Sequence, residues 1–90
     1  MAPASSIVVE FYGMARRRAG RSDVRLRANT LAEALAAVAG ECSQLTELLD
    51  GGRLSSHYLV SVNAGPFLAS LDVALDPGDR VLLLSADAGG

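Results

Sequence analysis

A single cysteine and a single histidine are the side chains best suited to chemistry of their own. Cys42 stands at the predicted start of a short helix, where the helix dipole lowers the pKa of a thiol, so it could carry a persulfide. No histidine or basic residue lies near it in the sequence, and lone cysteines usually serve as small apolar fillers. His57 has no metal-ligand spacing to Cys42 or to a second histidine. The sequence therefore predicts no metal site, and it favours a packing role for Cys42.

Arginines and glycines form the other motifs that could carry chemistry. Arg16–Arg18 could meet an acidic patch on a partner, although a solvated loop is the favoured interpretation. Gly51 and Gly52 stand where a helix is predicted to end, which indicates a turn. Neither Gly13 nor Gly20 opens a G-x-G-x-x-G or Walker pattern, so no phosphate-binding loop is predicted. With no catalytic constellation in the chain, we expect a protein that is not itself an enzyme.

The composition excludes several classes of function. The 90 residues include eight arginines, no lysine and ten acidic residues, for a formal charge of −2 and a pI near 5.1. Nucleic-acid-binding proteins normally have a basic face and a high pI, and aromatic residues for base stacking make up only 4% of this chain. The apolar runs are far shorter than the ~20 residues of a membrane span. With one cysteine and no signal-peptide pattern, the expected location is the cytoplasm.

The first part of the chain predicts two strands. Residues 7–12 are rich in β-branched and aromatic side chains, and residues 23–27 alternate apolar with charged side chains. The polar residues 13–22 between them predict a turn. The two strands are therefore expected to form a hairpin with a long loop.

A helix is expected over Leu31–Ala39, where apolar residues recur at helical spacing. Thr30 and Glu33 have the spacing of a capping box, and Gly40 is expected to end the helix in a left-handed conformation. A second, shorter helix is expected from about residue 42 to residue 49.

The last part of the chain predicts further strands. Residues 59–62 form one strand, residues 67–68 a brief one, and residues 71–75 alternate in a way that leaves strand and turn both open. Residues 76–79 are a strong turn, because proline and glycine have the dihedral angles that a type II turn needs. Residues 80–84 form the final strand, whose nearly unbroken apolar character indicates burial on both faces in the centre of a sheet.

These elements predict an α+β protein with the β-grasp (ubiquitin-like) architecture. One main helix crosses one face of a mixed sheet, a short second helix accompanies it, and the final strand lies parallel to the first. The expected domain covers residues 1–84, with a flexible start over residues 1–6. A flexible tail of small residues follows over residues 85–90 and ends on two glycines.

The same features, taken in order, resemble the MoaD/ThiS family of ubiquitin-like sulfur-carrier proteins. The resemblance runs from about residue 7 to the end, and it includes Val60-Ser61-Val62-Asn63, the segment Leu75–Val81 and the terminal Gly89-Gly90. Length and the second helical segment are more similar to the MoaD branch than to the shorter ThiS branch. The residues Ser85–Ala88 depart from many MoaD-type tails, which carry prolines and an apolar residue there.

The resemblance implies that the carboxylate of Gly90 is the reactive group. A partner adenylyltransferase of the ubiquitin-activating type would use ATP and Mg²⁺ to join this carboxylate to AMP. A persulfide sulfur would then displace the AMP and leave a thiocarboxylate for a sulfur-accepting synthase subunit. The nucleotide and the metal would belong to the partner, so no cofactor is expected on this chain.

The residues expected to contact partners lie in the tail and beside a predicted turn. They are Ser85, Ala86, Asp87, Ala88, Gly89 and Gly90, together with the apolar pair Phe67 and Leu68.

Three functions stay open at this point. The first is a sulfur carrier, with molybdopterin synthesis as the favoured destination and thiamine, tRNA thiolation or cysteine formation as others. The second is a ubiquitin-like modifier attached to target lysines through Gly90, and the third is a β-grasp interaction module with an incidental tail.

Overall fold

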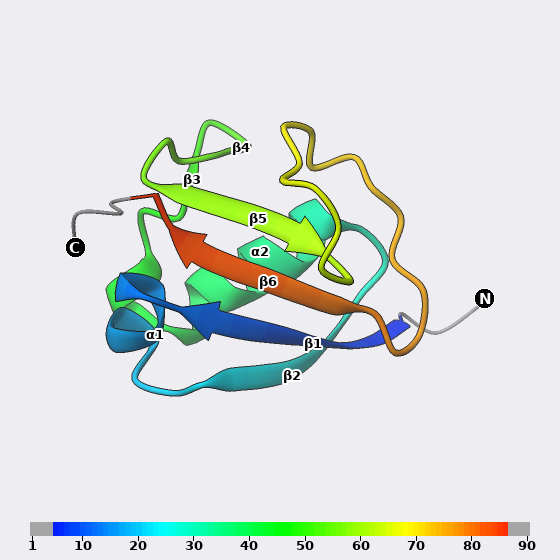
Figure 1. Ribbon diagram of the computed structural model, residues 1–90, viewed down its shortest axis with the longest axis horizontal. Helices are drawn as coiled ribbons and strands as arrows, with labels where there is room; N and C mark the ends of the chain where they lie inside the picture. The colour runs from blue at the N-terminus through cyan, green and yellow to red at the C-terminus, as the bar shows by residue number, and fades with distance from the viewer. Residues whose placement is uncertain (1–4, 87–90) are drawn as a thin grey trace.

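A four-stranded mixed sheet forms the centre of the molecule, with the strand order β2-β1-β6-β5 (Figure 1). The computed structural model describes residues 5–86. Its elements in chain order are β1 (Ser5–Tyr12), α1 (Met14–Ala19), β2 (Asp23–Ala28), α2 (Leu31–Glu41), a 3₁₀ turn (Ser43–Leu45), β3 (Leu49–Asp50), β4 (Arg53–Leu54), β5 (Tyr58–Val62) and β6 (Arg80–Ser85).

The sheet has the predicted β-grasp topology. Strand β1 pairs antiparallel with β2 and parallel with β6, and β6 pairs antiparallel with β5. Helix α2 lies across one face of the sheet (Figure 1). The predicted fold class, with the final strand central and parallel to the first, is therefore confirmed. In the described part of the chain no helix has the length and apolarity needed to cross a membrane.

Helix α2 and the inner face of the sheet build the core. The side chains that α2 buries are those at helical spacing: Leu31, Ala34, Leu35 and Val38. Alternate residues of the strands meet them, including Val9 and Phe11 of β1 and Val81 and Leu83 of β6. Since one helix covers only one face, the opposite side chains of β6 stay partly exposed. The prediction that β6 is buried on both faces is therefore wrong.

The predicted cap of α2 is present, with one change of partner. The Thr30 hydroxyl accepts a hydrogen bond from the Glu33 N–H at 3.2 Å, whereas the Glu33 carboxylate reaches the Asn29 N–H at 2.9 Å, one residue before the cap. The helix also continues through Gly40, so the predicted stop there is wrong. The Cys42 N–H still bonds to the Val38 carbonyl, which keeps the last turn helical.

The segment 13–22 contains a helix where the sequence predicted only a turn. Helix α1 lies between two glycines with positive φ, Gly13 at 62° and Gly20 at 73°. It buries the single residue Ala15. One buried alanine leaves no apolar stripe, which explains why the periodicity of the sequence did not reveal this helix.

The short helix predicted over residues 42–49 is a single 3₁₀ turn followed by a small hairpin. Leu45 and Leu48 are both fully buried, and the Leu48 N–H bonds to the Leu45 carbonyl at 3.0 Å. Three-residue spacing favours a 3₁₀ turn over an α-helix here. Gly51 and Gly52 then form the turn between β3 and β4, which confirms the turn predicted at these glycines.

The connection from β5 to β6 is irregular, and residues 67–68 are not a strand. Leu71 and Leu75 are buried, and the Leu31 N–H and Ala32 N–H at the start of α2 donate to carbonyls of residues 73 and 71. A single bridge joins Thr30 to Ala74. The alternation of residues 71–75 thus belongs to an extended segment that caps the start of α2.

The start of the domain differs from the expected flexible segment over residues 1–6. Ser5 and Ser6 belong to β1 and pair with Ala28 and Arg27. The Ser5 hydroxyl also donates to the Leu75 carbonyl at 3.1 Å. Backbone pairing and this contact explain why β1 begins two residues before its first apolar residue, Ile7. Residues 1–4 lie outside the described part.

Candidate functional site

Strand β6 carries the chain toward the terminal glycines. The strand includes Ser85, which is buried and paired with Tyr58 of β5. The Ala86 N–H then donates to the His57 carbonyl at 2.8 Å. The predicted boundary after residue 84 is thus one residue early, because β5 extends far enough to pair with Ser85. The expected site at Gly90, and the rest of the predicted tail from Asp87 onward, lie outside the described residues.

Tyr58 and Arg18 hold the base of this segment. Tyr58 is almost fully buried, and its hydroxyl accepts a hydrogen bond from the Arg18 guanidinium at 2.7 Å. The guanidinium carbon also lies 5.8 Å from the centre of the Tyr58 ring. A buried tyrosine needs a partner for its hydroxyl, and Arg18 of α1 supplies it. Strand β5, which pairs with the end of β6, is therefore held against α1 at this point.

The outer face of the sheet is the second part of the site. Where no helix covers it, a shallow apolar hollow is lined by Tyr12, Ser61, Ala64, Gly65, Phe67, Leu82 and Leu84. Tyr12 is 43% exposed and Phe67 57% exposed, and no other large hydrophobic residue of the described chain is exposed to this degree. Exposed apolar side chains gathered on one face are typical of a binding surface. We call these seven residues the outer-face hollow.

The predicted partner-binding pair is divided between the surface and the core. Phe67 is exposed and lines the outer-face hollow, and its contact with a partner stays a prediction. Leu68 is half-buried, packs against the core and donates its N–H to the Val60 carbonyl at 2.9 Å. Leu68 therefore has a mainly structural position.

Tyr12, Leu82 and Leu84 are surface residues that the sequence analysis did not identify. The single main helix predicted from the sequence would have indicated them. If one helix covers one face, alternate residues of the central strands must lie on the other face, whatever their apolarity. In β6 these are Leu82 and Leu84, and in β1 the paired residues are Glu10 and Tyr12.

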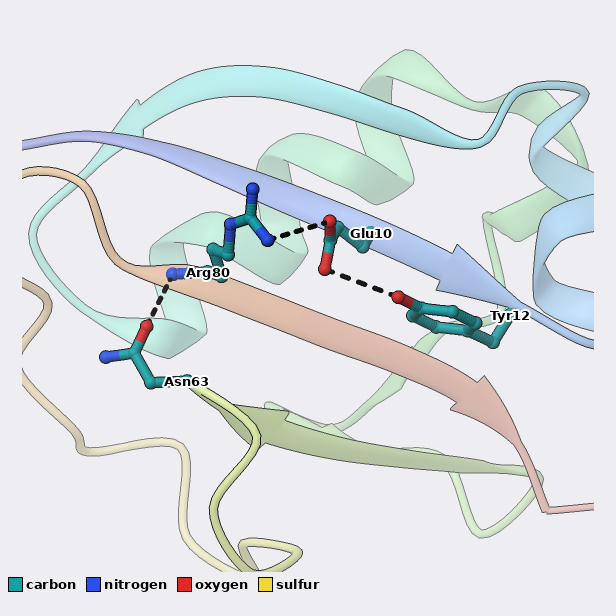
Figure 2. A network of polar contacts seen from close by, with 4 residues as sticks. All are labelled: Glu10, Tyr12, Asn63 and Arg80. Atoms are coloured by element: carbon teal, nitrogen blue, oxygen red, sulfur yellow. Dashed lines mark hydrogen bonds and ion pairs between the residues drawn. The ribbon is translucent and has the colours of Figure 1, made fainter.

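A polar network borders the outer-face hollow (Figure 2). The Arg80 guanidinium lies 3.7 Å from the Glu10 carboxylate, which also accepts a hydrogen bond from the Tyr12 hydroxyl at 3.4 Å. Asn63 adds a backbone link, because its side-chain oxygen accepts the Arg80 N–H at 2.9 Å. An ion pair so exposed contributes little to stability. The ion pair gives the outer-face hollow a charged border.

The turn after β5 sets the position of Phe67. Asn63 and Ala64 both have positive φ, at 53° and 59°. At the next residue of the turn, Gly65, a side chain would place its Cβ only 3.1 Å from the Val62 carbonyl oxygen, so glycine suits the close approach. Asn63 also donates to the Asp79 carboxylate, and this hydrogen bond lowers the pKa of Asp79, with a smaller contribution from the Asp76 N–H. The two connections at this end of the sheet are therefore tied together.

The cysteine and the histidine have no arrangement suited to catalysis. Cys42 is buried, and loss of water around it raises the pKa of its thiol, a shift that Arg21 opposes and Glu41 reinforces. His57 is exposed and lies beside the tail through its backbone carbonyl. Among residues 5–86 no group of three or more histidine, cysteine, aspartate or glutamate side chains could hold a metal ion.

Comparison with known proteins shows which solved structures share this fold. No family model and no curated protein matches the sequence. Small archaeal modifier protein 1 from Haloferax volcanii matches the structure with a TM-score of 0.81 and 26% identity, over 96% of this chain and 100% of that chain. The chain is a ubiquitin-like β-grasp protein. The predicted resemblance to the MoaD/ThiS family is confirmed at the level of the fold.

Two further solved structures are similar to this β-grasp protein. A Pyrococcus furiosus protein described as subunit 1 of a molybdopterin converting factor has a TM-score of 0.76 and 17% identity, with 91% of this chain and 98% of that chain covered. A chain of the BexX/CysO complex of Amycolatopsis orientalis has a TM-score of 0.76 and 22% identity, with 93% and 99% covered. At these identities the likeness concerns the fold.

Proposed function

We propose that this β-grasp protein is a sulfur carrier, with the carboxylate of Gly90 as the group that carries the sulfur. The observation that carries the proposal is the path of β6. This central strand ends at Ser85, and the sequence continues from it directly into a short run of small residues that ends on two glycines. The resemblance of the sequence and the fold to MoaD/ThiS proteins supports the same chemistry.

The proposed reaction is carried out by a partner of the ubiquitin-activating type, in the cytoplasm. A carboxylate oxygen of Gly90 attacks the α-phosphorus of ATP, held with Mg²⁺ on the partner, and pyrophosphate leaves. The outer sulfur of a persulfide then attacks the acyl carbon and AMP leaves. A second thiol cleaves the resulting acyl disulfide bond, which frees the thiocarboxylate and forms a disulfide on the donor. This chain acts as a protein cosubstrate, and the catalytic groups belong to the partner.

Glycine suits the end of a chain that must enter a closed nucleotide site. Side chains would clash in a narrow channel, whereas glycine passes and adopts backbone angles denied to other residues. Ordering such a segment costs conformational entropy, so affinity has to come from elsewhere on the molecule. We assign that role to the outer-face hollow, with Phe67 and Leu82 as apolar anchors. The similarity to a chain of the BexX/CysO complex supports recognition of this fold by a partner protein.

We favour molybdopterin synthesis as the destination of the sulfur. The similarity to a subunit of a molybdopterin converting factor supports this choice. The chain would then act as the small subunit beside a larger, sulfur-accepting synthase subunit. Thiamine synthesis, tRNA thiolation and cysteine formation are the alternatives within the same chemistry.

A second candidate function is protein modification through Gly90. The similarity to small archaeal modifier protein 1 favours it. Because the sequence contains no lysine, this chain cannot be the acceptor of its own lysine-linked conjugate. Any isopeptide adduct must therefore place Gly90 on another protein, and each attachment adds a single copy.

The test measures pyrophosphate release from ATP in the presence of the cognate adenylyltransferase. The protein ending at Gly90 is expected to stimulate release, and the Cys42→Ser variant should match it. Deletion of Gly90 should abolish the effect, because it withdraws the carboxylate by about 3.3–3.6 Å and displacements near 1 Å can cost about 100-fold in rate. If the shortened protein is as active as the parent, the sheet rather than the tail is the functional part, and the interaction-module function holds instead.

A further inference from the structure

Half of the positive charge of this chain is concentrated in one short segment of the sequence. Four of the eight arginines fall within residues 16–21, namely Arg16, Arg17, Arg18 and Arg21, whereas no acidic residue occurs between positions 11 and 22. The remaining residues of the chain hold four arginines against ten acidic side chains. The charge is therefore strongly polarised along a protein whose net charge is negative.

Three of these arginines are available to a partner. Arg16, Arg17 and Arg21 are exposed, and within residues 5–86 none of the three forms an ion pair. Arg18 differs, because it is engaged with Tyr58. The group is carried by an ordered helix, α1, and by the turn that ends it at Gly20. We call Arg16, Arg17 and Arg21 the basic edge.

The topology places the basic edge at the end of the sheet where the tail departs. Strands β1 and β6 are parallel, so α1, which follows β1 directly, lies at the same end as the last residues of β6 (Figure 1). Tyr12 pairs with Leu84, and a Cβ at Gly13 would lie 3.9 Å from the Leu84 side chain. Through Arg18 and Tyr58, α1 also holds the residue paired with Ser85.

We propose that the basic edge binds an acidic surface on the protein that receives the tail, beside the channel that the tail enters. This inference rests on the proposed function, in which a partner protein takes up Gly90. Positive charge next to the departing segment orients the encounter before the glycines enter the channel, since charged surfaces chiefly raise association rates.

A folded acidic protein fits the basic edge better than RNA does. A strand of nucleic acid would have to pass a molecule whose other charged residues are predominantly acidic, and phosphate binding normally requires a basic stripe. The sequence also has few aromatic residues for stacking single-stranded bases. An acidic protein surface of limited extent needs only the local charge that the basic edge provides.

The experiment compares two double charge reversals in the adenylation assay described above. The test variant is Arg16→Glu/Arg17→Glu. The control is Arg25→Glu/Arg27→Glu, which changes the same charge on exposed residues of β2 that pair with Val8 and Ser6, at the opposite end of β1. Circular dichroism establishes that both variants fold.

The test variant is expected to raise the KM for this protein about 10-fold at low salt, because two attractions become repulsions. Its kcat should stay near that of the parent, and the gap in KM should narrow as added salt screens the charges. The control should retain the parental KM. An equal rise in KM for both variants would overturn the basic edge, since net charge alone would then explain the effect.

A separate binding measurement tests the nucleic-acid alternative. A short oligouridine RNA is titrated against the parent at the same low salt. Binding of this probe that is lost in Arg16→Glu/Arg17→Glu, with KM in the adenylation assay unchanged, would overturn the acidic-protein proposal. An unchanged KM in the test variant would overturn the basic edge alone. A parent protein that fails to stimulate pyrophosphate release would instead refute the proposed function itself, so the two failures are distinguishable.

Discussion

Leu82 and Leu83 are neighbours on β6 that face opposite sides of the sheet, and they allow a matched test of its one-sided cover. Leu83 is fully buried beneath α2, whereas Leu82 is half-buried in the outer-face hollow. Leu83→Ala leaves an enclosed cavity and is expected to cost ~2–5 kcal/mol of unfolding free energy. Leu82→Ala loses only the partial burial of one side chain, which corresponds to ~1 kcal/mol.

The expected difference in unfolding free energy between the two variants is large for a protein of this size. Native proteins have about 0.05–0.15 kcal/mol of stability per residue, so 90 residues correspond to roughly 5–13 kcal/mol. Urea unfolding, followed by circular dichroism, is the assay. Leu83→Ala should lower the urea midpoint by roughly 1–3 M, and Leu82→Ala by less than about 1 M, for a slope of ~1.5 kcal/mol per M.

Binding should show the reverse order. Leu82→Ala is expected to raise the KM of this protein in the adenylation assay, because it removes an apolar anchor from the outer-face hollow. Leu83→Ala, assayed at a temperature where it is folded, should retain the parental KM. Equal losses of stability in the two variants would refute the reasoning, since β6 would then be covered on both faces.

Three further predictions concern the cap, the carboxylate network and the cysteine. Thr30→Ala should cost ~1 kcal/mol in urea unfolding, because it removes the acceptor for the Glu33 N–H; a change near zero would mean that the cap is dispensable. Asn63→Ala should raise the pKa of Asp79 toward its usual value in a carbon-detected NMR titration, since the Asn63 amide is the main cause of the lowered pKa. Because the pKa of Asp79 is lowered by folding, the stabilisation that the network provides is present above the unfolded-state pKa of Asp79 and is lost as the pH falls through the lowered folded-state pKa. An unchanged pKa in the variant would contradict this assignment. Cys42 should react with iodoacetamide far more slowly in the folded protein than in urea at neutral pH, because burial raises the pKa of its thiol; equal rates would show an accessible thiolate.

The parts of the fold that sequence reasoning predicted are those with a strong local pattern. The alternation of β1 and β2, the apolar stripe and capping box of α2 and the turn at Pro77 and Gly78 each have a cause within a few residues. The order of these elements then favours the observed sheet, because a crossover through α2 allows the first and last strands to pair in parallel.

The parts that could not be predicted depend on tertiary contacts. Helix α1 is stabilised by burial of Ala15 and by the contact between Arg18 and Tyr58, 40 residues apart. The segment 71–75 looks like a strand in the sequence, but its carbonyls are used by the start of α2. The exposure of Leu82 depends on how many helices cover the sheet, which the apolar run of β6 does not reveal.

For the candidate site, the sequence identified Phe67 but not the surface around it. Tyr12 comes from β1 and Leu84 from β6, and only the parallel pairing of these strands brings the two together. Arg16 and Arg17 were visible as a charged run, yet their position beside the departing tail follows from the topology alone.

The central claim is that the sulfur resides on the Gly90 carboxyl group. The most direct test incubates the protein with the cognate adenylyltransferase, ATP, a persulfide donor and a reducing thiol, and then locates the modification by tandem mass spectrometry. The account predicts one sulfur in place of one oxygen on the C-terminal Gly90 fragment, dependent on ATP and equally present in Cys42→Ser. Sulfur found on Cys42, with Gly90 remaining an ordinary carboxylate, would contradict it.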